Sequence, residues 1–235
     1  MKIKFIQKTT LVDYPGKIAC TIFLFGCNFR CGFCYNPELV LKDELPDLNK
    51  EEVLRFLESR RRYLDGVCFT GGEPLMTLDE TFLRDVKNLG YKIKIDTNGS
   101  FPEKLEGLIS RNLVDFVSMD IKGAKEDYEK IVNAPFDFFK LEESIRLISS
   151  LPEYEFRMTV VDRFHDFPKV LDAIKWVYDI SGKKIKKFSL QGFKNHGKFI
   201  DESFKDDKNA SREKLEELKK EILKYGFVEE INIRV

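Results

Sequence analysis

The sequence has no excess of charge and no long apolar run. Its 40 Lys and Arg residues balance 40 Asp and Glu residues, so the formal net charge is zero. A nucleic-acid binder that relies on bulk positive charge is therefore disfavoured. No apolar run approaches the roughly 20 residues of a membrane-spanning helix. Lys2, Lys4 and Lys8 interrupt the first apolar residues, which is unlike a signal peptide. These absences favour a cytoplasmic protein whose partners are neither membranes nor nucleic acids.

The sequence also lacks low-complexity linkers and any visible domain boundary. Its 235 residues include 43% hydrophobic residues and 21 Phe, which is enough to build a sizeable core. We therefore expect a single domain over residues 1–235.

Strand-like and helix-like segments alternate along the chain. Apolar, β-branched and aromatic runs predict strands at Lys17–Phe25, Gly66–Thr70, Tyr91–Asp96, Val114–Ile121, Tyr154–Val161 and Ile185–Gln191, with a final strand at Val228–Val235. Capping boxes at Asn49/Glu52 and Thr77/Glu80 predict helices that run to about Tyr63 and Leu89. Further helices are predicted at Pro102–Ser110, Leu141–Ser150, Asp166–Ile180 and Ser211–Tyr225.

Six strand–helix units predict an α/β fold with a parallel sheet and right-handed crossovers. Six units are too few for a closed eight-fold barrel, so we expect a partial (β/α)6 barrel of parallel strands with outer helices; a flat doubly wound sheet is the alternative. Several strands alternate polar with apolar residues, and Ser118, Asp120 and Lys122 share one face. This alternation favours a polar interior that binds a polar ligand. Lys92 and Lys94 also share the face of Asp96, an arrangement that the pattern leaves unexplained.

Three of the five cysteines lie within eight residues, at Cys27, Cys31 and Cys34. Three thiolates in one short loop can converge on an iron–sulfur cluster, whereas a structural zinc site usually has four protein ligands. Cys20 and Cys68 stand alone inside predicted strands, where a buried apolar role is the default. With three ligands, a four-iron cluster keeps one iron open to a substrate or cofactor. This spacing therefore favours a catalytic cluster, with a zinc site as the minor alternative.

The Cys27–Cys34 loop, followed by Gly71-Gly72-Glu73-Pro74 after the second strand, resembles the radical S-adenosylmethionine (SAM) superfamily. Asp96-Thr97-Asn98-Gly99, Met119-Asp120-Ile121-Lys122 and Phe156-Arg157 resemble later motifs of glycyl-radical-enzyme activating enzymes. Residues 11–16, and residues 27–30 together with residues 36–39, resemble the short anaerobic ribonucleoside-triphosphate reductase activating proteins.

This resemblance implies one 4Fe–4S cluster, held by Cys27, Cys31 and Cys34, whose open iron binds SAM. It implies SAM contacts from residues of four kinds: aromatic, glycine, aliphatic and charged. They are Phe33, Tyr35, Gly71, Gly72, Glu73, Asp96, Asp120, Ile121, Lys122, Arg157 and Lys194. In some activating enzymes the two aspartates also hold a monovalent cation, so Asp96 and Asp120 are candidates for such a site.

The implied reaction is reductive cleavage of SAM to a 5′-deoxyadenosyl radical, which takes hydrogen from a glycine of a partner glycyl radical enzyme. An anaerobic ribonucleotide reductase is the implied type of partner, with flavodoxin or ferredoxin as the electron donor. Two alternatives stay open at this point. One is a small-molecule radical SAM enzyme similar to 7-carboxy-7-deazaguanine synthase, and the other is a non-catalytic iron–sulfur or zinc protein.

Overall fold

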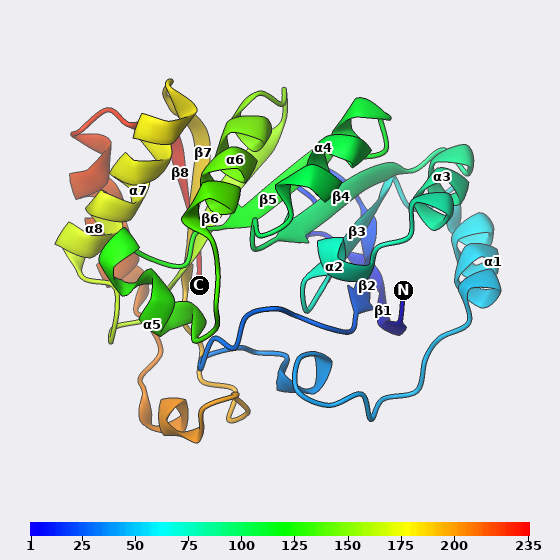
Figure 1. Ribbon diagram of the computed structural model, residues 1–235, viewed down its shortest axis with the longest axis horizontal. Coiled ribbons are helices and arrows are strands. Elements are labelled where there is room, and N and C mark those ends of the chain that lie inside the picture. The colour runs from blue at the N-terminus through cyan, green and yellow to red at the C-terminus, as the bar shows by residue number, and fades with distance from the viewer. The chain divides into compact units, whose positions relative to one another are not determined.

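The computed structural model describes residues 1–235 as an α/β protein whose strands and helices alternate along the chain (Figure 1). The chain forms two compact units. The first comprises residues 1–28, 36–97 and 101–117, and the second comprises residues 29–35, 98–100 and 118–235. None of the helices has both the length and the apolar character that crossing a membrane requires.

The first unit contains strands β1 to β4. β1 (Ile3–Thr10) pairs antiparallel with β2 (Ala19–Leu24), and β2, β3 (Gly66–Gly71) and β4 (Lys92–Thr97) pair in parallel. Its helices are α1 (Lys50–Arg60), α2 (Pro74–Thr77), α3 (Glu80–Asn88) and α4 (Pro102–Ser110), with a 3-10 turn at Pro37–Leu39. The Asn49 side chain caps α1, because its oxygen accepts hydrogen bonds from the backbone N–H groups of Glu51 and Glu52.

The second unit contains the parallel strands β6 (Tyr154–Val160), β7 (Ile185–Gly192) and β8 (Val228–Arg234). Its helices are α5 (Tyr128–Val132), α6 (Phe138–Ser149), α7 (Phe167–Ser181) and α8 (Arg212–Leu223), with 3-10 turns at Lys125–Asp127 and Glu202–Asp206. The side chains of Asp137, Asp166 and Ser211 cap α6, α7 and α8.

Strand β5 (Phe116–Asp120) contributes to both units. Within the first unit, the backbone N–H of Asp115 just before β5 donates to the carbonyl of Ile93 in β4. Within the second unit, the N–H of Ile121 just after β5 donates to the carbonyl of Arg157 in β6. Hydrogen-bonded strand neighbours therefore follow the chain order from β1 to β8.

The predicted α/β class, its six strand–helix units and the final strand are confirmed. Strand β1 was not predicted, because lysines break its apolar pattern; one of them, Lys4, is nevertheless buried and ion-paired with Asp43 and Asp47. The helix predicted from the Thr77/Glu80 capping box is wrong at its start. Thr77 ends the short helix α2, and Asp79 caps α3 through the N–H of Thr81.

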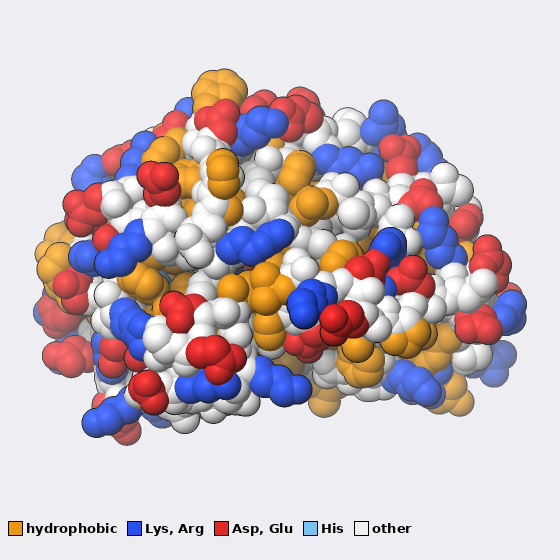
Figure 2. Space-filling view, turned by 60° about the horizontal axis from the view of Figure 1, so that its bottom comes forward, with side chains coloured by type: hydrophobic (Ala, Val, Ile, Leu, Met, Phe, Trp, Pro, Cys, Tyr) orange, Lys and Arg blue, Asp and Glu red, His pale blue; other side chains and the backbone are white.

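Charged side chains of both signs are interspersed on the face drawn in Figure 2, where no broad area carries a single sign. The balanced composition thus extends to the distribution of charge on that face.

Candidate active site

The two glycines at the end of β3 allow a very close approach of two backbone segments. Gly71 has a φ of +122°, and a Cβ on Gly72 would lie 2.0 Å from the carbonyl oxygen of Gly26. The N–H of Gly72 donates to Leu24 O at 2.9 Å, and the N–H of Glu73 donates to Gly26 O at 2.7 Å. Only glycine fits this geometry. The Gly-Gly-Glu motif is therefore hydrogen-bonded to the residue that precedes Cys27.

Glu73 joins this turn to β4. Its side chain is buried, and its Oε1 accepts hydrogen bonds from the backbone N–H of Leu75 at 3.1 Å and from Thr97 Oγ1 at 2.8 Å. The structure thus brings the Gly-Gly-Glu motif into contact with the Asp96-Thr97 motif. Sequence reasoning assigned no role to Thr97, and its place directly after Asp96 is the pattern that could have indicated one.

Lys94 and Asp96 form an ion pair on one face of β4. The Lys94 side chain is fully buried, and its Nζ also lies 3.8 Å from Cys68 Sγ. Lys92, which the sequence placed on the same face, is exposed instead and pairs with Asp115 at 3.0 Å. Of the two lysines that share the face of Asp96, only Lys94 is therefore buried, and Asp115 holds the Lys92 ammonium group at the protein surface.

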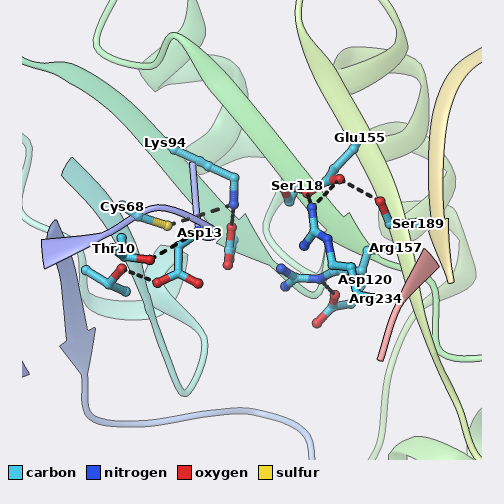
Figure 3. Close-up of polar contacts among 12 residues, drawn as sticks. Thr10, Asp13, Cys68, Lys94, Ser118, Asp120, Glu155, Arg157, Ser189 and Arg234 are labelled. Atoms are coloured by element: carbon cyan, nitrogen blue, oxygen red, sulfur yellow. Dashed lines mark hydrogen bonds and ion pairs between the residues drawn. The ribbon is translucent and has the colours of Figure 1, made fainter. Parts of the chain in front are cut away.

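In the second unit, Asp120 contacts two cationic side chains, and Figure 3 shows that of Arg157. Arg157 Nε donates to Asp120 Oδ1 at 2.6 Å, and Lys122 Nζ donates to Oδ2 at 3.0 Å. Burial alone would raise the pKa of Asp120, but the Arg157 and Lys122 charges outweigh it and hold that pKa well below its usual range. Asp120 and Lys122 each favour the charged form of the other. Burial would lower the pKa of Lys122, but the Asp120 charge outweighs burial and raises that pKa. Three predicted site residues thus meet in one cluster with one excess positive charge.

Glu155 forms a second charged group that the sequence analysis did not single out. It is fully buried, and its carboxylate accepts hydrogen bonds from Ser118 Oγ at 2.7 Å and Ser189 Oγ at 2.8 Å. Arg234 Nη2 reaches both carboxylate oxygens, at 3.0 and 2.9 Å. Side chains from β5, β6, β7 and β8 therefore meet at one carboxylate (Figure 3). The position of Glu155 two residues before Arg157, and hence on the same face of β6, could have indicated its inward orientation.

The segment Cys31–Tyr35 lies in the second unit and contacts the chain that connects β7 to α8. The N–H of Cys34 donates to Cys31 O at 3.0 Å, which closes a turn between the two thiols. The N–H of Asp201 donates to Gly32 O at 3.0 Å, and a Cβ on Gly32 would lie 2.6 Å from the Phe204 ring. Burial raises the pKa of the Cys31 thiol to about 11, although nearby Lys122 acts in the opposite direction.

The two predicted aromatic contacts have different surroundings. Phe33 is buried, and its ring lies 6.4 Å from Phe164 and 5.9 Å from Phe204. Tyr35 stacks on Phe193 at 6.1 Å, and its hydroxyl accepts a hydrogen bond from the backbone N–H of Lys194 at 2.8 Å. The structure thus brings Tyr35 and Lys194 together, through the backbone of Lys194 rather than its exposed side chain.

His165, to which the sequence analysis gave no role, supports the Asp120–Lys122–Arg157 cluster. The ring is fully buried; Nδ1 accepts from the N–H of Val161 at 2.9 Å, and Nε2 lies 2.9 Å from Lys122 O. Because Nδ1 accepts, the neutral ring carries its proton on Nε2 and donates it to that carbonyl. Burial lowers the pKa of His165 to about 4. The ring therefore fixes the backbone of Lys122 as a neutral donor.

Residues 21–193 match the model of the radical SAM superfamily. The chain belongs to the radical SAM superfamily. Enzymes of this superfamily carry a 4Fe–4S cluster and use SAM. The thiols of Cys31 and Cys34, held on one turn, are the donor type that such a cluster takes.

Relatives narrow the assignment within the radical SAM superfamily. A protein of Methanocaldococcus jannaschii named as a glycyl-radical enzyme activating enzyme is 30% identical over 227 residues, covering 94% of this chain and 91% of that protein. The pyruvate formate-lyase-activating enzyme of Clostridium pasteurianum is 30% identical over 233 residues, covering 93% and 95%. Both alignments span nearly the whole of each chain, which places this radical SAM protein among the activating enzymes.

A solved structure supports the fold independently. Streptococcus suis SuiB bound to S-adenosylmethionine superposes with a TM-score of 0.61 at 14% identity, covering 91% of this chain and 48% of that one. At this identity the likeness concerns the radical SAM fold alone.

The close approach at Gly72 predicts a large effect of a single methyl group. Gly72→Ala should destabilise the protein by about 3 kcal/mol or more, because the new Cβ meets backbone that cannot rotate away. Gly107→Ala is the matched control, since its Cβ in α4 would meet only the mobile end of Arg111. That change should be neutral or slightly stabilising. Urea unfolding of both variants measures the difference in unfolding free energy. Equal values would contradict the close approach of the backbone at Gly72.

The buried His165 predicts a loss of stability in acid. Its pKa is about 4 in the folded protein and about 6.5 when unfolded, so the unfolded chain binds the proton more readily. The stability contributed by the neutral ring is complete above pH 6.5 and is lost as the pH falls towards 4. Between pH 7 and pH 4, the His165→Gln variant should lose about 3 kcal/mol less unfolding free energy than the wild-type protein. Urea unfolding across this range measures it, and identical pH profiles would refute it.

Proposed function

We propose that this protein is a radical SAM activase that takes a hydrogen atom from a glycine of a separate glycyl radical enzyme. The observation that carries the proposal is the nearly full-length similarity to two activating enzymes, together with the Cys27–Cys34 loop. When bound, the reduced cluster supplies an electron that cleaves SAM into methionine and a 5′-deoxyadenosyl radical, the species that abstracts the hydrogen. The protein positions these groups and excludes side reactions.

The proposed cluster ligands are Cys27, Cys31 and Cys34. Their spacing within one loop supports the assignment, as does the turn that joins Cys31 to Cys34. The other two cysteines have a different character. Cys20 is buried in β2, where burial raises the pKa of its thiol to about 12, and Cys68 lies in β3 beside Lys94.

The proposed SAM contacts form a cationic group, an anionic turn and a set of flanking residues. The Asp120–Lys122–Arg157 cluster carries one excess positive charge and so suits the SAM carboxylate. Glu73, in its buried turn with Gly71 and Gly72, supplies a negative charge for the SAM ammonium group. The remaining proposed contacts flank these groups in sequence or surround the nucleoside, and they are Phe33, Tyr35, Asp96, Ile121 and Lys194.

The finer parts of the proposal concern partners and setting. We propose an anaerobic ribonucleotide reductase type of glycyl radical enzyme as the substrate, supported by the resemblance of residues 11–16, 27–30 and 36–39. A flavodoxin or ferredoxin is the proposed electron donor, in the cytoplasm. We also propose that the two compact units act together as one radical SAM domain over residues 1–235.

The ligand assignment predicts which cysteines the cluster needs. Anaerobic reconstitution should give about four irons per chain, with a brown colour that Cys27→Ala, Cys31→Ala and Cys34→Ala each abolish. Cys20→Ala and Cys68→Ala should keep it, because those thiols lie inside strands. Iron analysis and the visible absorption spectrum measure these outcomes. A colourless protein that binds zinc tightly would refute the assignment.

The activase proposal predicts that activity requires a partner protein. Reduced, reconstituted protein should convert SAM to 5′-deoxyadenosine, and with the partner it should produce a glycyl radical doublet in electron paramagnetic resonance. The matched control is a partner whose radical-bearing glycine is replaced by alanine, which should give no doublet. Turnover of a small metabolite at about 1 per second or faster without a partner would favour a small-molecule radical SAM enzyme instead.

A further inference from the structure

The two aspartates that are candidates for a monovalent-cation site are both engaged by the protein's own cations. In β4, Asp96 is ion-paired with Lys94, whose side chain is fully buried. Lys94 lies two residues before Asp96 on the same face of the strand, so the ammonium group is held at the carboxylate by the β geometry itself. A strand-borne cation of this kind cannot dissociate as a bound ion can.

Asp120 is compensated in the second unit in a similar way. Its Oδ1 accepts from Arg157 Nε at 2.6 Å, and its Oδ2 accepts from Lys122 Nζ at 3.0 Å. Each carboxylate oxygen therefore has a charged donor. Arg157 in turn extends from β6, whose backbone is hydrogen-bonded to the residue after Asp120 through Ile121 N and Arg157 O at 2.8 Å.

These donors do not fit a monovalent cation. Such an ion needs several oxygen atoms whose lone pairs point at it, together with a negative local charge that offsets its own. At Asp96 an ammonium group already occupies a carboxylate oxygen, and at Asp120 two cations face one carboxylate. A further cation beside either group would meet like charge in a partly buried environment, where repulsion is weakly screened.

We propose that Lys94 on Asp96, and Lys122 with Arg157 on Asp120, stand in place of a monovalent cation, so that this protein binds SAM without one. Lys94 is accordingly a positioning residue, which acts by holding the charge and orientation of Asp96. This inference rests on the proposed function, because it assumes that these aspartates belong to the SAM site.

The first test measures the SAM affinity of the reconstituted wild-type protein in chloride salts of potassium, sodium and choline at equal ionic strength. We expect dissociation constants that agree within about twofold, because the required charge is built into the chain. A tenfold or greater weakening in choline would overturn the inference while leaving the activase proposal intact. A failure to bind SAM in any of the three salts would overturn the proposed function itself.

The second test changes Lys94. Lys94→Ala leaves the partly buried Asp96 beside a space, so we expect at least a tenfold weaker SAM affinity in choline and a partial recovery in ammonium or potassium chloride. Lys94→Met fills the space without charge, and we expect the same loss without recovery. Lys92→Ala is the matched control, since this exposed lysine of β4 pairs with Asp115 and should leave affinity unchanged.

The cluster absorption spectrum and the melting temperature show whether each variant is folded and loaded. Wild-type affinity in both folded Lys94 variants would overturn the positioning role. If Lys94→Ala loses SAM affinity and no small cation restores it, the claim that the Lys94 charge replaces a bound ion is overturned. The salt series on the wild-type protein requires no variant, so it decides the inference even where the Lys94 variants are unstable.

Discussion

The approach of the Gly72 backbone to Gly26 is the contact on which the proposed site depends. Two hydrogen bonds, from Gly72 N to Leu24 O and from Glu73 N to Gly26 O, join the end of β3 to the residues that lead into the cysteine loop. No side chain fits between these segments. Glu73 then carries the connection to β4 through Thr97. Backbone hydrogen bonds thus fix the end of β3 against the residues that follow β2, and the buried Glu73 carboxylate fixes the end of β4.

Charge compensation inside the two units is the second organising constraint. Lys94 with Asp96, Arg157 and Lys122 with Asp120, and Arg234 with Glu155 place ionised groups in interiors where an unpaired charge would be costly. Each carboxylate is paired within its own unit. Buried pairs of this kind contribute little net stability, but they fix the positions of charges with an accuracy that surface pairs lack.

Much of the fold could be predicted from sequence because local patterns agree with it. The alternation of apolar strands and capped helices indicated all six strand–helix units. The sequence does not predict β1, because a lysine in an apolar run usually indicates a surface position. Lys4 is buried only because it pairs with Asp43 and Asp47, some forty positions later. The start of α3 was misplaced because Thr77 and Asp79 are both competent caps, and the Pro74 turn decides between them.

The candidate site was less predictable, because its supporting residues carry no motif. Asp120, Lys122 and Arg157 were found through resemblance and strand parity, and they do meet. Glu155 in β6 and Arg234 in β8 form an ion pair between residues almost eighty positions apart, which a single sequence does not reveal. His165 was passed over because a lone histidine in a loop has no pattern; its role depends on the carbonyl of Lys122, forty-three residues away.

The contact between Gly32 and Phe204 has a consequence for how the chain is made. The cysteine turn is synthesised early, whereas the aromatic ring and the Asp201 N–H that cover Gly32 lie about 170 residues later in the sequence. At roughly 5–20 residues per second, the turn leaves the ribosome on the order of ten seconds before its cover exists. During that interval the thiols of Cys31 and Cys34 are open to iron–sulfur donors and to oxidants alike. The contacts that cover Gly32 can form only once Asp201 and Phe204 have been synthesised.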